Sequence, residues 1–320
     1  MARQNKNVKN YIKVFAPATV ANVGCGFDIF GFALDNPGDV VEIELSATGG
    51  VVIEQITGDD GLLPVHADKN TASRAIQYML AELNLPYGVR MKLHKKMPIG
   101  SGLGSSAASS VAGVFGLNQL LQEPVPKLKL LEYAAEGERI TSGGSLHLDN
   151  VTACLYGGFV LVRTKSPPDI VELPVPADLF CAIVHPRIEI KTSESRKMLK
   201  NVIPLATAID QWANVAGLVS SLYTNDLALF GRSLQDKVAE PVRSILIPCY
   251  AQMKKAALES GAIGFGISGS GPSVFALSET RQAAETIGHN LLYILNENDI
   301  ANDIYISPIN KNGPRIVKIS

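Results

Sequence analysis

The sequence is poor in cysteine, has no long apolar run and lacks an excess of charge of either sign. Its four cysteines are widely spaced with no C-x-x-C pair, so neither a disulfide framework nor a zinc motif is indicated. No stretch reaches about 18 consecutive apolar residues, so we expect no membrane span. Lys and Arg number 29 against 30 Asp and Glu, and the one basic cluster, Met1 to Lys13, has the character of a solvated tail. This balanced charge, without a clustered positive surface, argues against nucleic-acid binding.

An apolar signal segment is also missing from the first residues, and together with the cysteine usage this favours a cytoplasmic location. What is present is a chain of 320 residues with 46% hydrophobic content, enough for one large or two medium domains. The paired prolines in Ser166-Pro-Pro-Asp interrupt both strands and helices and suggest a domain junction. We therefore expect an N-terminal domain of residues 1–168 and a C-terminal domain of residues 169–320.

Apolar periodicity predicts strands and helices that are mixed without a strict alternation, which favours an α+β fold over a doubly wound sheet. The expected strands cover residues 11–16, 40–47, 90–95, 157–164, 179–184 and 304–307, with a strand-turn-strand unit over 264–277. The expected helices cover residues 70–85, 105–121, 127–138, 206–231, 240–260 and 281–295. Asn70 or Thr71 can cap the first of these helices.

A glycine-rich loop is the strongest single signal. Residues 98–108 read Pro-Ile-Gly-Ser-Gly-Leu-Gly-Ser-Ser-Ala-Ala and join a strand to a helix. Glycines let backbone N–H groups converge on one point, and the start of the helix adds unpaired donors, so the loop is suited to hold phosphate. It is not a Walker A loop, because no lysine occurs between Pro98 and Leu121. Either another kind of cradle or a metal with other residues must then neutralise the phosphate charge.

A second glycine pattern is a decoy. The run Gly264-Phe-Gly266-Ile-Ser-Gly269 matches the dinucleotide fingerprint G-x-G-x-x-G. That fingerprint requires a strand before it and a helix after it. Here a helix is expected before it and an apolar, strand-like run after it, so we reject dinucleotide binding.

Three motifs together resemble the family of galactokinase, homoserine kinase, mevalonate kinase and phosphomevalonate kinase, the GHMP kinases. They are Pro17-Ala-Thr-Val-Ala-Asn22-Val-Gly24-Cys-Gly26-Phe-Asp28, the loop at 98–108 and Gly266-Ile-Ser-Gly-Ser-Gly-Pro272-Ser-Val-Phe. The resemblance implies a two-domain α+β fold, with a ribosomal-protein-S5-like N-terminal domain, a ferredoxin-like C-terminal domain and an ATP site between them. It also implies a small-molecule kinase that uses ATP and Mg²⁺.

Further details resemble the homoserine kinase branch of that family, among them His147-Leu-Asp149-Asn150-Val ahead of Gly157-Gly158 and the helix opening Glu240-Pro241-Val-Arg243. The resemblance implies that the acceptor is bound by Asn22, Asp28, His147, Asn150, Arg196 and Arg243. It implies catalytic roles for Asn150, Thr192 and Arg196. It implies Mg²⁺ ligation by Ser106 and Glu138, with Glu136 as a rival for the second position. It implies ATP contacts from Asn70, Pro98, Ile99, Gly100, Ser101, Gly102, Leu103, Gly104, Ser105, Ser106, Ala107 and Ala108.

The chemistry of these side chains favours an amino-acid acceptor. Asp28 can bind an ammonium group, and Arg196 and Arg243 can bind a carboxylate or the γ-phosphate. L-homoserine fits this pattern, whereas mevalonate, shikimate, a sugar or a non-catalytic sensor role stay open as alternatives. A homodimer is expected by base rate and family habit.

The position that carries an aspartate base in some relatives is Asn150 here. An amide cannot accept a proton, so we expect transfer without a dedicated carboxylate base, with Asn150 aligning the acceptor hydroxyl. Asp149 is the rival base. Cys25 has no adjacent base and is not expected to act as a nucleophile.

Overall fold

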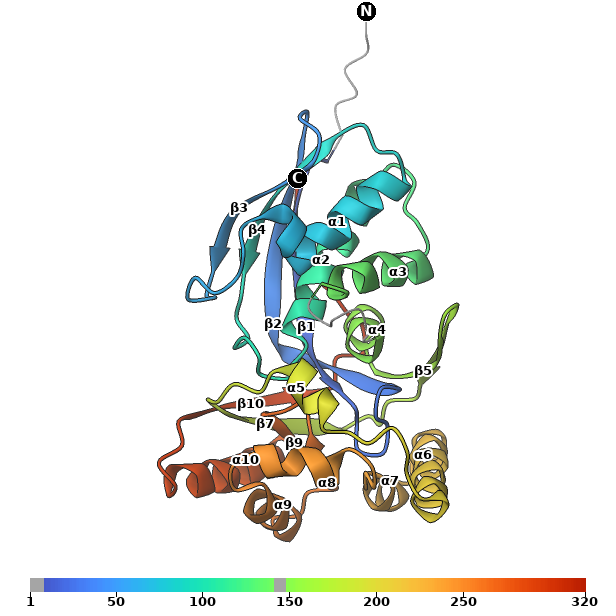
Figure 1. Cartoon of the computed structure of the whole chain (residues 1–320), viewed down its shortest axis with the longest axis vertical. Helices are drawn as coiled ribbons and strands as arrows, with labels where there is room; N and C mark the ends of the chain where they lie inside the picture. The colour runs from blue at the N-terminus through green and yellow to red at the C-terminus, as the bar shows by residue number, and fades with distance from the viewer. Residues whose placement is uncertain (1–8, 141–147) are drawn as a thin grey trace, which may run out of the picture.

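Two β-sheets organise the molecule in the computed structural model, which describes residues 9–140 and 148–320. Within those residues the large sheet has seven strands in the order β11-β1-β2-β4-β3, with β5 paired to β2 and β6 paired to β5. The small sheet has four antiparallel strands in the order β10-β7-β9-β8. Figure 1 shows the large sheet above the small one, with short helix α5 between the two halves.

The strands are β1 (Tyr11–Ala21), β2 (Phe30–Ser46), β3 (Val51–Thr57), β4 (Gly88–His94), β5 (Phe159–Lys165), β6 (Pro168–Leu173), β7 (Phe180–Pro186), β8 (Gly264–Ile267), β9 (Val274–Ser278), β10 (Asn302–Pro308) and β11 (Arg315–Ile319). The helices are α1 (Thr71–Glu82), α2 (Ser105–Leu120), α3 (Lys127–Glu138), α4 (Leu148–Tyr156), α5 (Thr192–Lys197), α6 (Leu205–Thr224), α7 (Leu227–Ser233), α8 (Glu240–Arg243), α9 (Tyr250–Glu259) and α10 (Arg281–Asn296).

Helix α2 is the central helix of the larger half. Its sequence is rich in alanine, serine and glycine, and twelve of its sixteen residues are buried. Small side chains let neighbours approach closely; a Cβ at Gly116 would lie only 2.9 Å from Ile43 of β2. The helix therefore packs against the large sheet on one side and against α1 and α3 on the other (Figure 1). This packing fixes the N-terminus of α2, where the glycine-rich loop ends.

Strands β7, β8 and β9 of the small sheet are almost fully buried, whereas the edge strand β10 is mostly half-buried. Phe275 and Leu277 join the core of the larger half, whereas Val274 and Ala276 pack with residues of α9 and α10. The ring of Phe275 meets Phe32 of β2 edge-on, with centroids 5.9 Å apart. The two sheets thus pack against each other through apolar side chains, which fixes their relative position.

Most expected elements are present, and the differences have local causes. The helix expected over 206–231 is two helices, because Asn225 adopts a left-handed conformation (φ 53°) and Asp226 caps α7. The helix expected over 240–260 is likewise divided into α8, a 3₁₀ turn (Ser244–Leu246) and α9. Strands β3, β6 and β11 and helix α4 were not anticipated. The rejected dinucleotide pattern lies in the antiparallel hairpin β8–β9, as expected.

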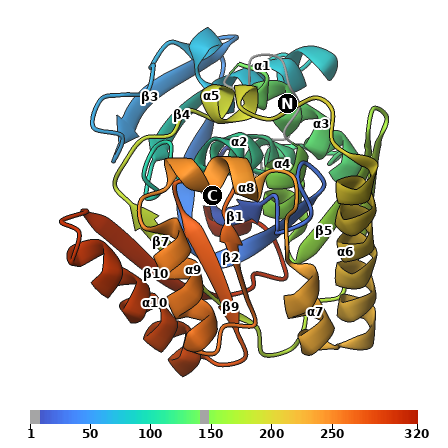
Figure 2. The same ribbon diagram turned by 60° about the horizontal axis from the view of Figure 1, so that its bottom comes forward.

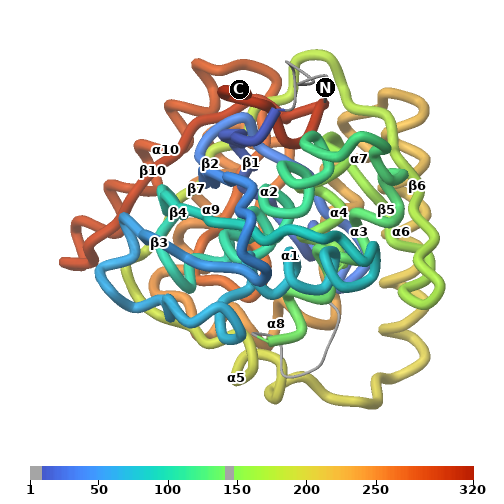
Figure 3. Tube along the Cα trace, turned by 90° about the horizontal axis from the view of Figure 1, so that it is seen from above, coloured from blue at the N-terminus to red at the C-terminus, as the bar shows by residue number. Residues whose placement is uncertain are grey.

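Pro167 lies in the turn between β5 and β6 and Pro168 begins β6, so the paired prolines do not separate the two sheets. Strand β11 also returns to the large sheet and pairs with β1 (Figure 3). The division into residues 1–168 and 169–320 stays a prediction, and strand pairing assigns β6 and β11 to the sheet of the first half. Among the described residues, no helix is long and apolar enough to cross a membrane.

Candidate active site

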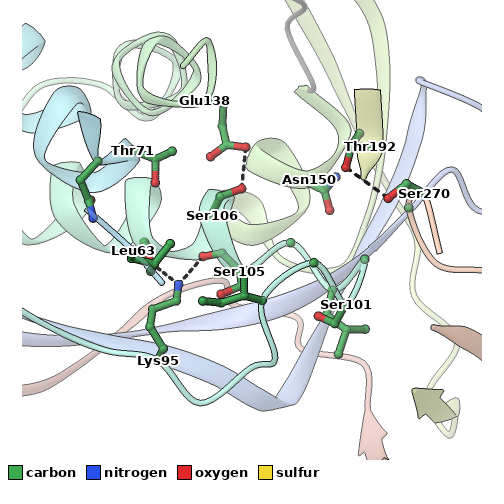
Figure 4. Close-up of a pocket in the computed structure, with 18 of the residues that line it drawn as sticks. Leu63, Thr71, Lys95, Ser101, Ser105, Ser106, Glu138, Asn150, Thr192 and Ser270 are labelled. Carbon is green, nitrogen blue, oxygen red and sulfur yellow. Dashed lines mark hydrogen bonds between the residues drawn. The ribbon is translucent and has the colours of Figure 1, made fainter. Parts of the chain in front are cut away.

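A cavity of about 290 Å³ lies where the two halves meet. It brings together segments that are distant in sequence, namely the glycine-rich loop, the first motif, the start of α4, α5 and the end of α8. Figure 4 shows part of its lining, with Ser106 at the start of α2 facing Glu138, Ser105 on the side of Lys95, and Asn150 near Thr192 and Ser270. The sequence-predicted residues that line it are Asn22, Asp28, Asn70, Ile99, Gly100, Ser101, Gly102, Leu103, Gly104, Ser105, Ser106, Glu138, Asn150, Thr192, Arg196 and Arg243.

The glycine-rich loop has the backbone that its composition predicts. Gly100, Gly102 and Gly104 all have positive φ, at 71°, 78° and 69°. Gly104 immediately precedes α2, so the unpaired N–H groups of the helix start where the loop ends. Positive φ is costly for residues with a Cβ, so the glycines are required for the fold of the loop. The result is a backbone-lined cradle at the positive end of a buried helix.

The three sequence motifs contact one another through the loop. The N–H of Thr19 in the first motif donates to the Leu103 carbonyl at 3.0 Å. In the third motif, Ser268 Oγ donates to the Gly102 carbonyl at 2.8 Å. Asn22 Nδ2 then links the first motif to the third by donating to the Gly269 carbonyl at 2.9 Å. Motifs found separately in the sequence therefore form one connected structure around the cavity.

Asn150 lies beside the end of the glycine-rich loop. Its Oδ1 accepts a hydrogen bond from Thr19 Oγ1 at 2.8 Å, which leaves the amide nitrogen as its donor. Thr19 was not singled out from the sequence, although it stands inside the first motif. The neighbouring Asp149 is buried and does not line the cavity. Burial and the charge of Asp28 raise the pKa of Asp149 to about 6.

Asp28, the anion predicted to bind the acceptor, is already paired in this structure. Arg196 on α5 forms a bidentate contact with it, and Lys165 Nζ lies 3.1 Å from its Oδ2. Burial acts to raise the pKa of Asp28, but hydrogen bonds and charge from the two cations outweigh burial and lower that pKa. Lys165 is a residue that the sequence did not reveal, because it ends a strand outside every motif.

Arg243 is the most buried cation of the site, with 3% of its surface exposed. Its Nη1 donates to the Gly269 carbonyl at 3.0 Å, whereas its buried Nε has no hydrogen-bond partner among the described residues. The ring of Phe27 lies beneath both arginines, 4.9 Å from Arg243 and 5.5 Å from Arg196. Phe27 therefore supports two cations, and its signal in the sequence was its place one residue before Asp28. Arg243 follows Glu240-Pro241 in a helix with proline in its first turn, as expected.

Ser106 and Glu138, the predicted Mg²⁺ ligands, lie together where α2 begins beside the end of α3. Ser106 Oγ donates to Glu138 Oε2 at 2.9 Å (Figure 4). Burial raises the pKa of Glu138 to about 7, although Ser106 and Lys95 act to lower it. Glu136, the rival ligand, pairs with Arg139 and does not line the cavity. The geometry thus favours Glu138 for a role in the site.

Lys95 is a buried cation that sequence reasoning missed. It forms an ion pair with Asp39 and donates to Ser109 Oγ at 2.6 Å and to the Ser105 carbonyl at 2.9 Å. It precedes the glycine-rich loop by three residues, outside the range in which a Walker-type lysine would stand. The contacts show that it braces the first turn of α2 from below (Figure 4).

Other predicted residues have a mixed outcome. Asn70 lines the cavity, but its side chain is occupied in capping α1, with Oδ1 accepting from Ala72 N at 3.1 Å and Nδ2 donating to the Pro64 carbonyl. Its contact with adenine stays a prediction. Thr192 Oγ1 lies 3.2 Å from Ser270 Oγ at the cavity wall. His147 lies outside the described residues. Burial raises the pKa of Cys25 to about 12, which agrees with a thiol that is not a nucleophile.

Comparisons with known proteins agree with this geometry. A family model described as the GHMP kinases N-terminal domain matches residues 70–158, and the GHMP kinases C-terminal model matches residues 218–294. The homoserine kinase of Chlorobium phaeobacteroides is 42% identical over 318 residues, which cover 96% of this chain and 99% of that protein. The crystal structure of homoserine kinase from Cytophaga hutchinsonii is 52% identical, with a TM-score of 0.94, and covers 99% of this chain and 100% of that one. L. major mevalonate kinase in complex with R-mevalonate, at 18% identity and a TM-score of 0.71, shares the fold.

Proposed function

The chain belongs to the GHMP kinase family, and we propose that it transfers the γ-phosphoryl group of ATP to the hydroxyl of L-homoserine. The product would be O-phospho-L-homoserine, an intermediate on the route to threonine. Relatives named homoserine kinase, which match this chain over nearly its whole length, support this acceptor.

One observation carries the proposal: a backbone phosphate cradle and a set of amino-acid-binding charges line the same cavity. An α-amino acid needs an anion for its ammonium group and a cation for its carboxylate. Asp28 supplies the anion, and Arg243 supplies a buried guanidinium whose Nε has no partner among the described residues. Because a buried donor without a partner is costly, a carboxylate that accepts from it would gain a strong, charge-assisted hydrogen bond.

In the proposed complex the substrate exchanges ion pairs with the protein. Arg196 binds Asp28 in this structure, so the incoming ammonium group replaces Arg196 at that carboxylate. Arg196 then becomes available for the substrate carboxylate or the γ-phosphate. Lys165 keeps its place beside Asp28 and holds that carboxyl ionised.

Ser106 and Glu138 fit a magnesium ion. Both offer oxygen ligands, which Mg²⁺ prefers, and Glu138 is a buried carboxyl with a raised pKa that a cation would stabilise as the carboxylate. No group of three His, Cys, Asp or Glu side chains that could hold a metal occurs among the described residues, so phosphate oxygens would complete the coordination. When bound, Mg²⁺ supplies charge neutralisation for the triphosphate.

The transfer step forms a bond from the acceptor oxygen to the γ-phosphorus and breaks the bond from that phosphorus to the β,γ-bridging oxygen, releasing ADP. Asn150 aligns the acceptor hydroxyl with its amide, because its Oδ1 is held by Thr19. The hydroxyl proton passes late to a phosphoryl oxygen, without a carboxylate base. Thr192 and Arg196 stabilise the charge that develops on the transferred group.

A coupled ADP-release assay with L-homoserine, shikimate, mevalonate and galactose tests the acceptor. We expect turnover with L-homoserine and formation of its phosphate ester by ³¹P NMR. Turnover that is faster with any other member of the panel would refute the acceptor assignment and leave the kinase assignment intact. A rise in melting temperature with Mg-ATP but no turnover on the panel would point to a sensor.

The remaining parts of the proposal concern assembly and location. We keep the homodimer, the cytoplasmic location and the two-domain boundary near residue 168 as predictions. Sedimentation at several protein concentrations tests the dimer, since a monomer at all of them contradicts it.

A further inference from the structure

Two of the segments that carry predicted acceptor-binding residues are far apart in the sequence and meet at the cavity. Residues 22–28 carry Asn22, Phe27 and Asp28, and the end of α8 carries Arg243. Acceptor binding requires Asp28 and Arg243 at a fixed separation, because one amino acid must reach both. Side chains behind the cavity wall join these two segments.

Gln211 of α6 is the first half of the connection. Its Nε2 donates to the Cys25 carbonyl at 2.7 Å and to Asp236 Oδ1 at 3.0 Å. Its Oε1 accepts from the N–H of Lys237 at 2.8 Å. A single half-buried amide thus binds residues 22–28, called the acceptor loop below, on one side and the segment before α8 on the other. Figure 2 shows α6 along one edge of the molecule, with α7 and α8 between it and α9.

Asp236 is the second half. Its carboxylate accepts backbone hydrogen bonds from Val238, Ala239 and Glu240 at 2.8 to 3.1 Å. These donors are at and before the start of α8, so Asp236 fixes the direction in which this four-residue helix leaves. Arg243 is the last residue of that helix. The orientation of Arg243 therefore depends on a carboxylate that does not itself line the main cavity.

A close backbone contact also links the acceptor loop to the segment before α8. Gly24 of the first motif has φ of 51°, and a Cβ there would lie 2.2 Å from the Leu234 carbonyl oxygen. The acceptor loop and residues 234–239 are thus in contact at the backbone as well as through Gln211. Two independent links keep these segments in register.

We propose that Gln211 and Asp236 are positioning residues of the acceptor site, which set the separation between Asp28 and Arg243. Neither contacts the substrate; both act through the loop and the helix that do. This inference rests on the proposed function for the identity of the acceptor, but the coupling of these residues to Arg243 does not depend on it.

The test compares Gln211→Leu and Asp236→Ala with a matched control, Asp226→Ala. Asp226 caps α7 by accepting from Leu229 N at 2.8 Å, and among the described residues its side chain makes no hydrogen bond to residues 22–28. We expect both positioning variants to raise the KM for L-homoserine about tenfold or more, since small misplacements at a reacting site are costly, with the KM for ATP changed less than twofold. Asp236→Asn keeps a capping oxygen and should recover most of the loss. The control should lower the melting temperature and leave both KM values unchanged.

A second readout does not require activity. The side-chain Nε–H signal of Arg243 in ¹⁵N NMR should shift in Gln211→Leu and Asp236→Ala and stay in place in Asp226→Ala. If the wild-type enzyme prefers another acceptor, the same KM comparison is made with that acceptor, so the two proposals fail separately. Equal effects of Asp226→Ala and the positioning variants, or an unmoved Arg243 signal in a folded Gln211→Leu, would overturn the inference.

Discussion

The two sides of the cavity are built on different principles. The donor side is made largely of backbone: three glycines at positive φ, the start of a buried helix and carbonyl contacts to the third motif, beside the proposed metal ligands Ser106 and Glu138. The acceptor side is made of charged side chains that come from four separate elements, and its anion is neutralised by its own cations. The donor side is thus already formed, whereas the acceptor side must exchange contacts to bind. Apart from Ser106 and Glu138, donor binding should tolerate side-chain changes, whereas acceptor binding should tolerate few.

The largest effect should come from adding a methyl group to the donor backbone. A Cβ at Gly102 would lie 2.5 Å from the Ser268 carbonyl oxygen and 2.8 Å from that of Gly271. Gly102→Ala should therefore displace the loop and lower kcat/KM for ATP about 1,000-fold, since several aligned donors would move at once.

Gly100→Ala is the matched control for that change. Its φ of 71° gives similar strain, but its Cβ would meet only Glu189 Cγ at 3.6 Å. It should cost about 1–2 kcal/mol of stability and little activity. Steady-state kinetics and thermal unfolding of both variants test this comparison. An equal fall in kcat/KM for ATP in the two variants would show that close packing of the loop against the third motif is not needed for ATP binding.

Asn150 lies where the two sides meet, so its loss should be next in size. Asn150→Ala should lower kcat about 100-fold by losing alignment of the acceptor hydroxyl, with the KM for ATP nearly unchanged. Asp149→Asn should keep kcat within about twofold, because Asp149 is buried outside the cavity. Single-turnover rates distinguish the two. Loss of the reaction in folded Asp149→Asn, with Asn150→Ala active, would make Asp149 the base.

On the acceptor side, Arg243→Met should raise the KM for L-homoserine roughly 30-fold, as expected for the loss of a charge-assisted hydrogen bond. Binding of ATP should change little, since the cradle is made by other residues. Calorimetric titration with each ligand measures the two affinities. A larger loss of affinity for ATP than for L-homoserine would place Arg243 on the donor side and contradict the difference drawn between the two sides.

The smallest effect on activity is expected for Asp149→Asn, which should instead change the free energy of unfolding in a direction that depends on pH. The pKa of Asp149 in the fold is about 6, above its ordinary value of 3.8. Proton binding therefore stabilises the fold fully below pH 3.8, and that stabilisation is lost as the pH rises through 6. Asp149→Asn removes this loss, so it should be more stable than wild type by about 2–3 kcal/mol at pH 8 and nearly equal at pH 4. Urea unfolding at both pH values measures it, and a variant that is less stable at pH 8 contradicts the assignment.

The same contrast explains what could be predicted from the sequence. The glycine-rich loop depends on local backbone conformation, so Gly100, Gly102 and Gly104 were found from composition and spacing alone. Asp28 and Arg196 were found through motifs, but their mutual ion pair was not, because 168 residues separate them. Lys95 and Lys165 belong to no motif, and only the fold brings them to the site.

The ends of helices and strands were likewise predictable only where a local sequence signal marks them. Helices with clear apolar periodicity, such as α1 and α10, were predicted nearly to their ends. The break at Asn225 was missed because apolar residues continue on both sides of it. Strand β11 is mostly exposed and has no pattern of burial, and its place is set by its partner β1.

That last strand has a consequence for how the molecule is made. Ile12 pairs with Ile319, so one edge of the large sheet stays open until residue 319 has emerged from the ribosome. During that interval β1 presents unpaired N–H and C=O groups, the kind of edge on which chains aggregate. A nascent chain stalled before β11 should therefore aggregate more readily than a chain in which β11 has paired with β1.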